Sequence, residues 1–268
     1  MVNWAVFSPH PPLLVPEIGG KMLTEVKTTQ ENLQRIFSQT ESVDTVIVIT
    51  PHGFASRNNL TLVNDDQLRG QLMNFGGGCP VIELEVNKIL SDMVSQTVED
   101  LDIGVNTITS SHINSREELL DHGAYVPLYY ALEKLVLKPE IVIVNPGLLP
   151  VPKLWETGCE LAKNLQECGQ KIGLIISGDL SHSLSYSAPA GYHPQAQSFD
   201  DKIYDILQNQ SLTKLLQLPN ELLENGAECG YRPLVLGSGI IGGKKGEQAE
   251  VLSYEAPFGV GYLVARLV

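Results

Sequence analysis

Three histidines follow apolar, strand-like segments of the chain. His10 lies in NWAVFSPHP, His52 in TVIVITPHG and His182 in IGLIISGDLSH. In open α/β sheets, ligands bind beyond the carboxyl ends of the strands, so the three imidazoles converge on one crevice if their strands are neighbours. Pro9 and Pro51 stiffen the backbone immediately before the first two histidines. These two Pro-His turns therefore indicate a pair of metal ligands.

The segment NGAECGYRPL offers a third ligand, because it places Glu228 beside Cys229 just before a predicted helix. Imidazole suits iron, zinc, copper and nickel, so the histidines do not choose among these ions. Two histidines and a carboxylate form the facial triad of non-haem Fe(II) oxygenases. Two histidines and a thiolate favour zinc or a less common iron site. Both residues also have a structural interpretation, because an acid stabilises a helix N-terminus and a small cysteine packs in a core.

His182 and His122 are candidates for chemistry beside a metal. His182 follows SGDLS, and a histidine that titrates near neutral pH is a natural general base. Asp179 could orient this histidine or cap the segment that follows it. His122 lies between Asp121 and Gly123 at the start of a predicted helix. It could donate a hydrogen bond to the substrate or act as a structural cap.

The elements that must position these residues alternate between strands and helices. Short apolar and β-branched segments predict strands at 3–8, 45–50, 59–64, 104–109, 140–145, 172–177, 249–254 and 260–266. Periodic apolar positions predict helices at 20–39, 83–98, 123–136, 152–169, 196–208 and 230–241. This alternation predicts an α/β fold with a mostly parallel, mixed central sheet and helices on both faces. The last two strands are expected to form an antiparallel edge, and residues 1–268 a single domain.

Composition limits the partners of the protein. The net charge of −13 argues against nucleic acid and anionic membranes, because phosphates repel an acidic surface. No apolar run is long enough to span a membrane, and the first residues lack the features of a signal peptide. The four cysteines form no CxxC pair, which argues against a zinc knuckle or a disulfide framework. We therefore expect a reducing, cytoplasmic location.

No Walker loop or GxSxG elbow occurs, and no GxGxxG follows a predicted strand.

Taken together, five motifs resemble the class III extradiol ring-cleavage dioxygenase superfamily, in the branch that includes the catalytic β-subunit of protocatechuate 4,5-dioxygenase. They are FSPHPPLLVPEIG (7–19), TPHG (50–53), LDHGAYVPLYY (120–130), SGDLSH (177–182) and AECGYRPL (227–234). The resemblance implies an Fe(II) ion bound by His10, His52 and Glu228. It also implies that His182 is the active-site base and that His122 contacts the substrate or a ligand.

The resemblance implies a reaction as well. Such an enzyme opens a catechol-like aromatic diol with O₂, beside the diol rather than between its hydroxyls, and zinc can replace iron in a purified sample. The superfamily also contains Memo-like proteins, in which a cysteine occupies the third ligand position, and CGYRP resembles their pattern. Cys229 would then replace Glu228, and the alternative function is metal binding for redox or partner binding without dioxygenase activity. A zinc hydrolase that uses the same histidines is a third possibility. The expected partners are a small aromatic substrate and O₂, and members of this superfamily often self-associate as homo-oligomers.

Overall fold

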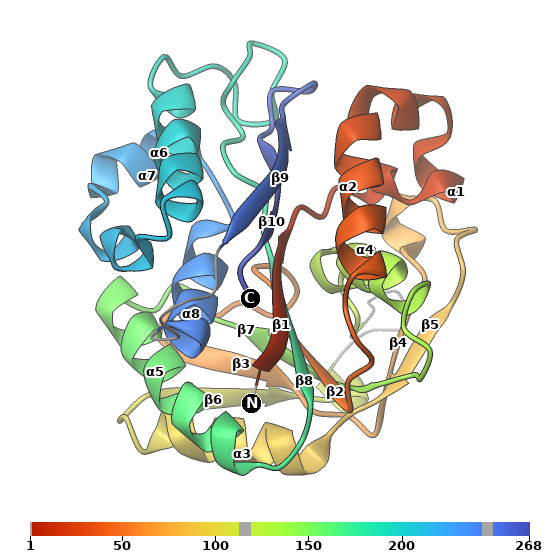
Figure 1. The fold of residues 1–268 in the computed structure, drawn as a ribbon, viewed down its shortest axis with the longest axis vertical. Helices are drawn as coiled ribbons and strands as arrows, with labels where there is room; N and C mark the ends of the chain where they lie inside the picture. Colours follow the sequence, from red (N-terminus) through yellow and green to blue (C-terminus); the bar gives the residue numbers. More distant parts are fainter. Residues whose placement is uncertain (1, 113–118, 243–248) are drawn as a thin grey trace.

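The computed structural model describes residues 2–112, 119–242 and 249–268. A sheet of eight strands forms its centre, in the order β6-β3-β7-β2-β8-β1-β10-β9 (Figure 1). The strands are β1 (Val2–Ser8), β2 (Thr45–Ile49), β3 (Asn59–Val63), β6 (Gly104–Ile108), β7 (Glu140–Asn145), β8 (Ile172–Ser177), β9 (Glu250–Glu255) and β10 (Tyr262–Arg266).

The four central strands β7, β2, β8 and β1 run parallel, as the apolar strand pattern predicts. β3 is antiparallel to β7 and parallel to β6 on one side. On the other side β10 is antiparallel to β1, and β9 is antiparallel to β10 at the sheet's edge. The predicted mixed sheet and its antiparallel C-terminal edge are therefore confirmed.

Helices cover both faces of this sheet (Figure 1). One face packs against α3 (Lys88–Glu99), α5 (Val151–Glu167), α6 (Ala196–Gln208), α7 (Asn220–Gly226) and α8 (Tyr231–Ile241). The other face packs against α2 (Lys27–Ser38) and α4 (His122–Leu132), with the short α1 (Pro16–Gly19) nearby. The predicted two-sided covering is confirmed.

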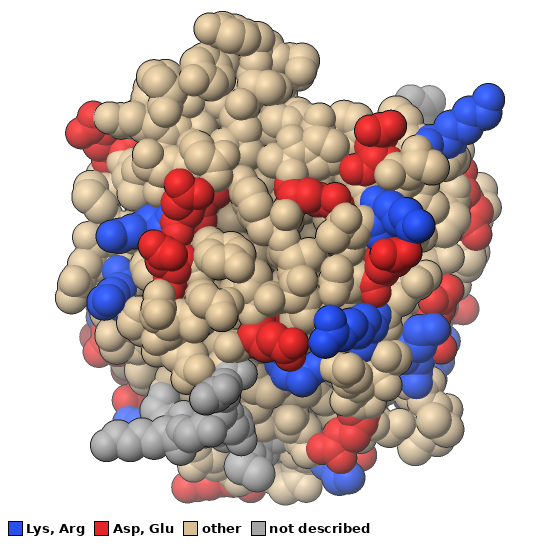
Figure 2. Space-filling view, turned by 45° about the horizontal axis from the view of Figure 1, so that its top comes forward, with Lys and Arg blue, Asp and Glu red and all other residues tan. Residues whose placement is uncertain are grey.

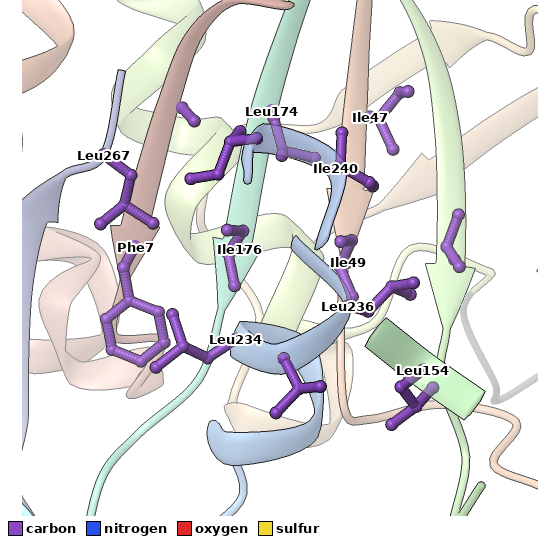
Figure 3. Packing of buried hydrophobic residues seen from close by; sticks show 14 of the residues in the cluster. Phe7, Ile47, Ile49, Leu154, Leu174, Ile176, Leu234, Leu236, Ile240 and Leu267 are labelled. Atoms are coloured by element: carbon purple, nitrogen blue, oxygen red, sulfur yellow. The ribbon is translucent and has the colours of Figure 1, made fainter. Parts of the chain in front are cut away.

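Side chains of the central strands alternate between two hydrophobic cores. In β2, Ile47 and Ile49 pack with α5 and α8, whereas Val46 and Val48 face α2 and α4. Figure 3 shows the first core, in which Ile176 of β8 lies close to the side chains of α8. Because both faces are buried, these strands are apolar at every position rather than at every second one.

Two glycines let α5 and α8 approach closely. A Cβ added at Gly158 of α5 would lie 2.4 Å from the carbonyl oxygen of Leu236. A Cβ at Gly239 of α8 would lie 2.6 Å from the carbonyl oxygen of Trp155 in α5. Gly158 and Gly239 therefore serve the packing of these two helices.

The prediction of a helix at 83–98 was wrong for the first part of that segment. The segment 83–98 begins with strand β5 (Ile82–Glu85), which pairs with β4 (Gln67–Gly70) in a separate two-stranded sheet. Its residues alternate between buried and exposed, which is the period of a strand. Helix α3 begins only after Asn87, whose side chain accepts a hydrogen bond from the Leu90 N–H at 2.9 Å.

The predicted helix 20–39 also differs from the structure. Its first part is a 3₁₀ segment (Gly20–Val26), and the α-helix begins at Lys27. The short helix α7 was not predicted.

Acidic and basic side chains are interspersed on the face of the molecule shown in Figure 2. Within the described ranges, no helix combines the length and the apolar character needed to cross a bilayer.

Candidate metal centre

Three central strands deliver the predicted histidines to one edge of the sheet. β8 lies between β2 and β1, and the three run parallel. Ser8 at the end of β1 is paired with Ser177 at the end of β8. The loops that carry His10, His52 and His182 therefore leave the sheet side by side, as the sequence predicts.

His10 is held in a defined orientation and tautomer. The side chain is buried, and its Nδ1 lies 2.8 Å from Ser177 Oγ. That hydroxyl donates its single proton to the carbonyl oxygen of Gly123 at 2.5 Å, so it must accept from the imidazole. His10 Nδ1 therefore carries the proton, and Nε2 presents a lone pair to the centre of the site. The backbone N–H of His10 donates to Asp179 Oδ1 at 3.0 Å, which fixes the loop.

His52 faces this lone pair. Its Nε2 lies 2.9 Å from His10 Nε2, with the two rings nearly perpendicular at 80°. Asn145 at the end of β7 donates to the His52 carbonyl oxygen at 2.6 Å, and Thr50 Oγ1 accepts from the His52 N–H at 3.2 Å. Two nitrogen lone pairs at this distance repel each other unless a proton or a cation lies between them. The pair is thus suited to share one positive charge.

His122 lies at the first position of α4, against His52. The two rings are stacked, with centroids 4.2 Å apart and an interplanar angle of 28°. An ion lies close to the plane of each imidazole that binds it, and two stacked rings cannot both meet that condition. The helix is capped by Asp121, which accepts hydrogen bonds from Gly123 and Ala124. His122 is therefore neither the cap nor well placed to share an ion with His52.

Cys229 reaches the site through a close backbone contact. A Cβ added at Gly178, just after β8, would lie 2.1 Å from the Cα of Gly230, just before α8. This approach lets Asp179 N–H donate to Cys229 Sγ at 3.3 Å. The same sulfur lies 3.5 Å from His10 Nε2. The thiol and the His10 lone pair are therefore neighbours.

The Glu228 carboxylate is directed at the helix instead. Its Oε2 accepts a hydrogen bond from the Tyr231 N–H at 2.5 Å in the first turn of α8. Within the described ranges, two sets of three donor atoms lie within 4.8 Å of one another: His10 with His52 and His122, and His10 with Asp179 and Cys229. Glu228 is in neither set. Cys229 therefore contacts His10, but neither set joins it to both His10 and His52, and the identity of the third ligand stays a prediction.

His182 borders the same cluster. Its Nε2 lies 3.8 Å from Cys229 Sγ, and its N–H donates to the Gly226 carbonyl oxygen at 2.9 Å. The neighbouring Ser181 N–H donates to Asp200 at 2.8 Å, which anchors this loop to α6. In the part of the chain that the structure describes, the Asp179 carboxylate contacts His10 rather than His182.

Burial keeps the imidazoles neutral. It lowers the pKa of His52 and of His122 to about 4, and the pKa of His182 below its usual value. The pKa of His10 is lowered furthest, by burial and then by the neighbouring imidazoles. Neutral imidazole is the form that binds metal ions, so the site is ready to do so at neutral pH.

Asp179 and Cys229 respond to burial in the same direction. Burial raises the pKa of Asp179 to about 7 and the pKa of the Cys229 thiol well above its usual value. Without a cation, the thiol is therefore protonated. A bound cation reverses this preference, because metal ions deprotonate a coordinating thiol. The donor set of neutral imidazoles and a thiol thus fits a metal ion.

Two cavities border the histidine cluster. One has a volume of about 260 Å³ and is lined by Gly53, Phe54, Leu72, Asn74, Phe75, Asp121 and His122. The other has a volume of about 190 Å³ and is lined by Pro51, Ala55, Pro146, Gly147, Leu148, Glu228, Cys229, Arg232 and Pro233. Both are smaller than the roughly 300–1,000 Å³ typical of drug-sized ligands, so they suit small molecules.

Comparison with known proteins places the chain in a family. The model of the catalytic LigB subunit of aromatic ring-opening dioxygenase matches residues 4–265. The chain belongs to the LigB family. Protein CA_C1420 of Clostridium acetobutylicum is 31% identical over 272 aligned positions, which cover 99% of this chain. The match covers 57% of that relative's own length, so the relative is the longer protein.

A solved structure has a similar fold. The crystal structure of an uncharacterized protein of Escherichia coli K12, JW3007, aligns with a TM-score of 0.65 at 17% sequence identity. The alignment covers 99% of this chain and all of that one. At this identity the likeness shows the fold alone.

Proposed function

We propose that this LigB-family protein is an iron-dependent oxidoreductase that opens a small aromatic diol with O₂, and that His10, His52 and Cys229 hold the ion. The observation that carries the proposal is that His10 Nε2 is adjacent to one donor from each of two other segments. His10 Nε2 lies 2.9 Å from His52 Nε2 and 3.5 Å from Cys229 Sγ. The family match supports the class of reaction.

The donor spacing supports one shared ion. Donors that lie about 2.0–2.3 Å from one tetrahedral ion are roughly 3.3–3.8 Å from each other. The distance from His10 to Cys229 is within this range. The distance from His10 to His52 is shorter, so binding an ion requires the imidazoles to separate by about half an ångström. His52 and Cys229 belong to no common set of donors within 4.8 Å, so binding also requires these two side chains to move closer together. When bound, the ion supplies the redox chemistry that lets O₂ react with an aromatic diol.

His182 is proposed to take a proton from a diol hydroxyl at its Nε2. The nitrogen lies 3.8 Å from Cys229 Sγ, at the border of the proposed ligand set. Burial lowers the pKa of His182, so the ring is neutral and able to accept a proton at neutral pH. The loop that carries it is fixed at both Ser181 and His182 by hydrogen bonds.

His122 is proposed to border the substrate rather than the ion. It lines the larger cavity, and Phe75 lies beside it with ring centroids 5.0 Å apart. The two rings offer faces and edges against which an aromatic substrate can pack. This cavity is therefore the proposed entry for the diol.

The direct test loads the purified protein with Fe(II) under anaerobic conditions. Catechol and 3,4-dihydroxybenzoate are then added with air, while O₂ uptake and the yellow ring-opened product are followed. We expect uptake of one O₂ for each ring opened, because both oxygen atoms enter the product. Iron-replete protein that leaves both diols intact would refute the proposed reaction.

A second candidate function is metal binding without ring opening, for redox or partner binding. One observation favours it: Cys229, rather than the carboxylate of Glu228, faces the imidazoles. A reducing cytoplasm would keep this thiol available. Tight iron binding without turnover in the assay above would support this second function over ring opening.

A further inference from the structure

We propose that Phe75 sets the size limit of the diol that reaches the histidine cluster, and that the loop Gln71–Cys79 holds its ring in place. This inference rests on the proposed function, because it names a residue that selects the substrate of the same site. Three observations carry it: the contact between Phe75 and His122, the volume of the cavity that both residues line, and the closed base of the loop.

Phe75 is placed against His122 rather than in a hydrophobic core. Its ring centroid lies 5.0 Å from that of His122, with the two ring planes at 58°. The side chain is 43% exposed and belongs to neither of the two cores. A large aromatic ring that stays partly exposed forgoes the stabilisation that full burial would bring, so core packing does not account for its position. A contact with the substrate accounts for it.

A row of rings leads from the surface to the proposed metal ligands. His122 is stacked on His52 with centroids 4.2 Å apart, and His52 Nε2 lies 2.9 Å from His10 Nε2. Exposure falls along this row, because Phe75 is exposed, His122 and His52 are half-buried, and His10 is buried. A diol that enters through the cavity beside His122 therefore passes Phe75 before it reaches the proposed ion.

The cavity that Phe75 and His122 line has room for one aromatic ring. Its volume is about 260 Å³. A cavity of about 150 Å³ holds benzene, so two rings need about 300 Å³. Phe54 lines the same cavity, but it packs against the core beneath α2 and α4, so moving it would disturb that core. Truncation of Phe75 is therefore the change that enlarges the cavity without loss of core packing.

The loop that carries Phe75 is closed at its base. It joins β4 to β5, and its two ends are bonded to each other: Gln71 Nε2 donates to the Cys79 carbonyl oxygen at 3.0 Å, and Cys79 Sγ donates to the Gln71 carbonyl oxygen at 2.9 Å. Just beyond this base, the Tyr125 hydroxyl of α4 donates to the Pro80 carbonyl oxygen at 2.5 Å. These bonds tie the loop to the helix whose first residue lines the cavity, so the ring of Phe75 is held beside that cavity.

The test compares two diols that differ by one phenyl ring. Isothermal titration calorimetry under anaerobic conditions measures the affinity of the Fe(II)-loaded protein for catechol and for 4-phenylcatechol. We expect the wild type to bind catechol at least about tenfold more tightly, although a second ring would otherwise add apolar burial. Phe75→Ala should bind 4-phenylcatechol at least about tenfold more tightly than the wild type does, and catechol within about threefold, because it frees the space of one ring. Phe75→Tyr, which keeps the ring, should retain the preference for catechol.

A matched control shortens another apolar side chain of the same loop. Met73 is 59% exposed and lies outside the described lining of the cavity, so Met73→Ala should keep the preference for catechol. Wild-type protein that binds the two diols equally, or binds neither, would overturn the proposal. A preference that survives Phe75→Ala, or one that Met73→Ala removes equally, would also overturn it.

The result separates this inference from the proposed function. Size-selective binding that depends on Phe75, without ring opening, would retain the size limit and remove the reaction. Ring opening of both diols with equal kcat/KM, unchanged by Phe75→Ala, would retain the reaction and remove the size limit. Because Phe75 lies outside both cores, Phe75→Ala should fold like the wild type. If it does not, Phe75→Leu decides, because it frees part of the same space and should weaken the preference for catechol.

Discussion

Replacing Gly178 with alanine should damage both the stability of the protein and its affinity for a metal ion. The added Cβ would lie 2.1 Å from the Cα of Gly230. Carbon atoms pack best at about 3.5–4.0 Å, so the two backbones must separate by more than about 1 Å. Neither atom belongs to a flexible side chain, so no rotamer change relieves the contact.

The separation acts directly on the proposed ligands. Gly230 follows Cys229, and the N–H groups of both donate to the Asp179 carbonyl oxygen, at 3.0 and 3.4 Å respectively. A shift of about 1 Å breaks these bonds and moves Cys229 Sγ beyond the roughly 3.3–3.8 Å expected for two donors of one ion. We expect a loss of about 1–3 kcal/mol in the free energy of unfolding, as in other overpacked cores. We also expect metal affinity to fall at least about tenfold, as when the supporting shell of a metal site is removed.

Gly239→Ala supplies the matched control. It also creates a clash with backbone, because a Cβ on Gly239 of α8 would lie 2.6 Å from the Trp155 carbonyl oxygen of α5, but it lies ten residues from Cys229. Urea denaturation measures the stability of both variants, and titration with Co(II), followed by its thiolate charge-transfer band, measures affinity. Both variants should lose stability, and only Gly178→Ala should lose affinity. A Gly178→Ala protein with wild-type stability, or with lowered stability and unchanged Co(II) affinity, would refute the reasoning.

Other substitutions test the site and the loop that anchors it. His182→Ala should keep its iron and lose about 10²–10⁴-fold in turnover of catechol, as expected for removal of a general base; full activity would exclude this role. Cys229→Ser should lose most bound iron by metal analysis, whereas Glu228→Gln should keep it; the reverse result would restore Glu228 as the ligand. Burial raises the pKa of Asp200 from 3.8 to about 7, so its contribution to stability is present below about pH 4 and lost as pH rises through 7. Asp200→Asn should make the free energy of unfolding, measured by urea denaturation, depend less steeply on pH between about 4 and 7. An unchanged slope of the unfolding free energy against pH would contradict this prediction.

The central sheet could be predicted because its signals are local. Buried parallel strands require unbroken apolar segments, and all eight predicted segments are strands of the large sheet. The two-stranded sheet was missed because the Ile82–Glu85 strand is short and runs almost directly into α3. Its apolar positions also fit a helical period over the longer window, so periodicity alone did not separate the two elements.

The convergence of His10, His52 and His182 could also be predicted, because position after a parallel strand determines the edge that a loop occupies. The hydrogen-bond partners that fix these side chains could not be predicted. The proton on His10 Nδ1 is determined by Ser177, whose own hydroxyl proton is used by the Gly123 carbonyl oxygen. That chain of contacts joins segments more than 50 positions apart, and no local pattern encodes it.

The sequence alone did not determine which of Glu228 and Cys229 faces the histidines. Adjacent residues point in different directions, so at most one of them is expected to reach the histidines. The direction depends on how the loop enters α8, and this is determined by the contact between Gly178 and Gly230. With those backbones touching, Cys229 turns toward His10, and Glu228 turns toward the free N–H groups of the helix. A glycine about 50 positions away therefore determines which of the two side chains faces His10, and Gly178→Ala tests this arrangement without removing either candidate ligand.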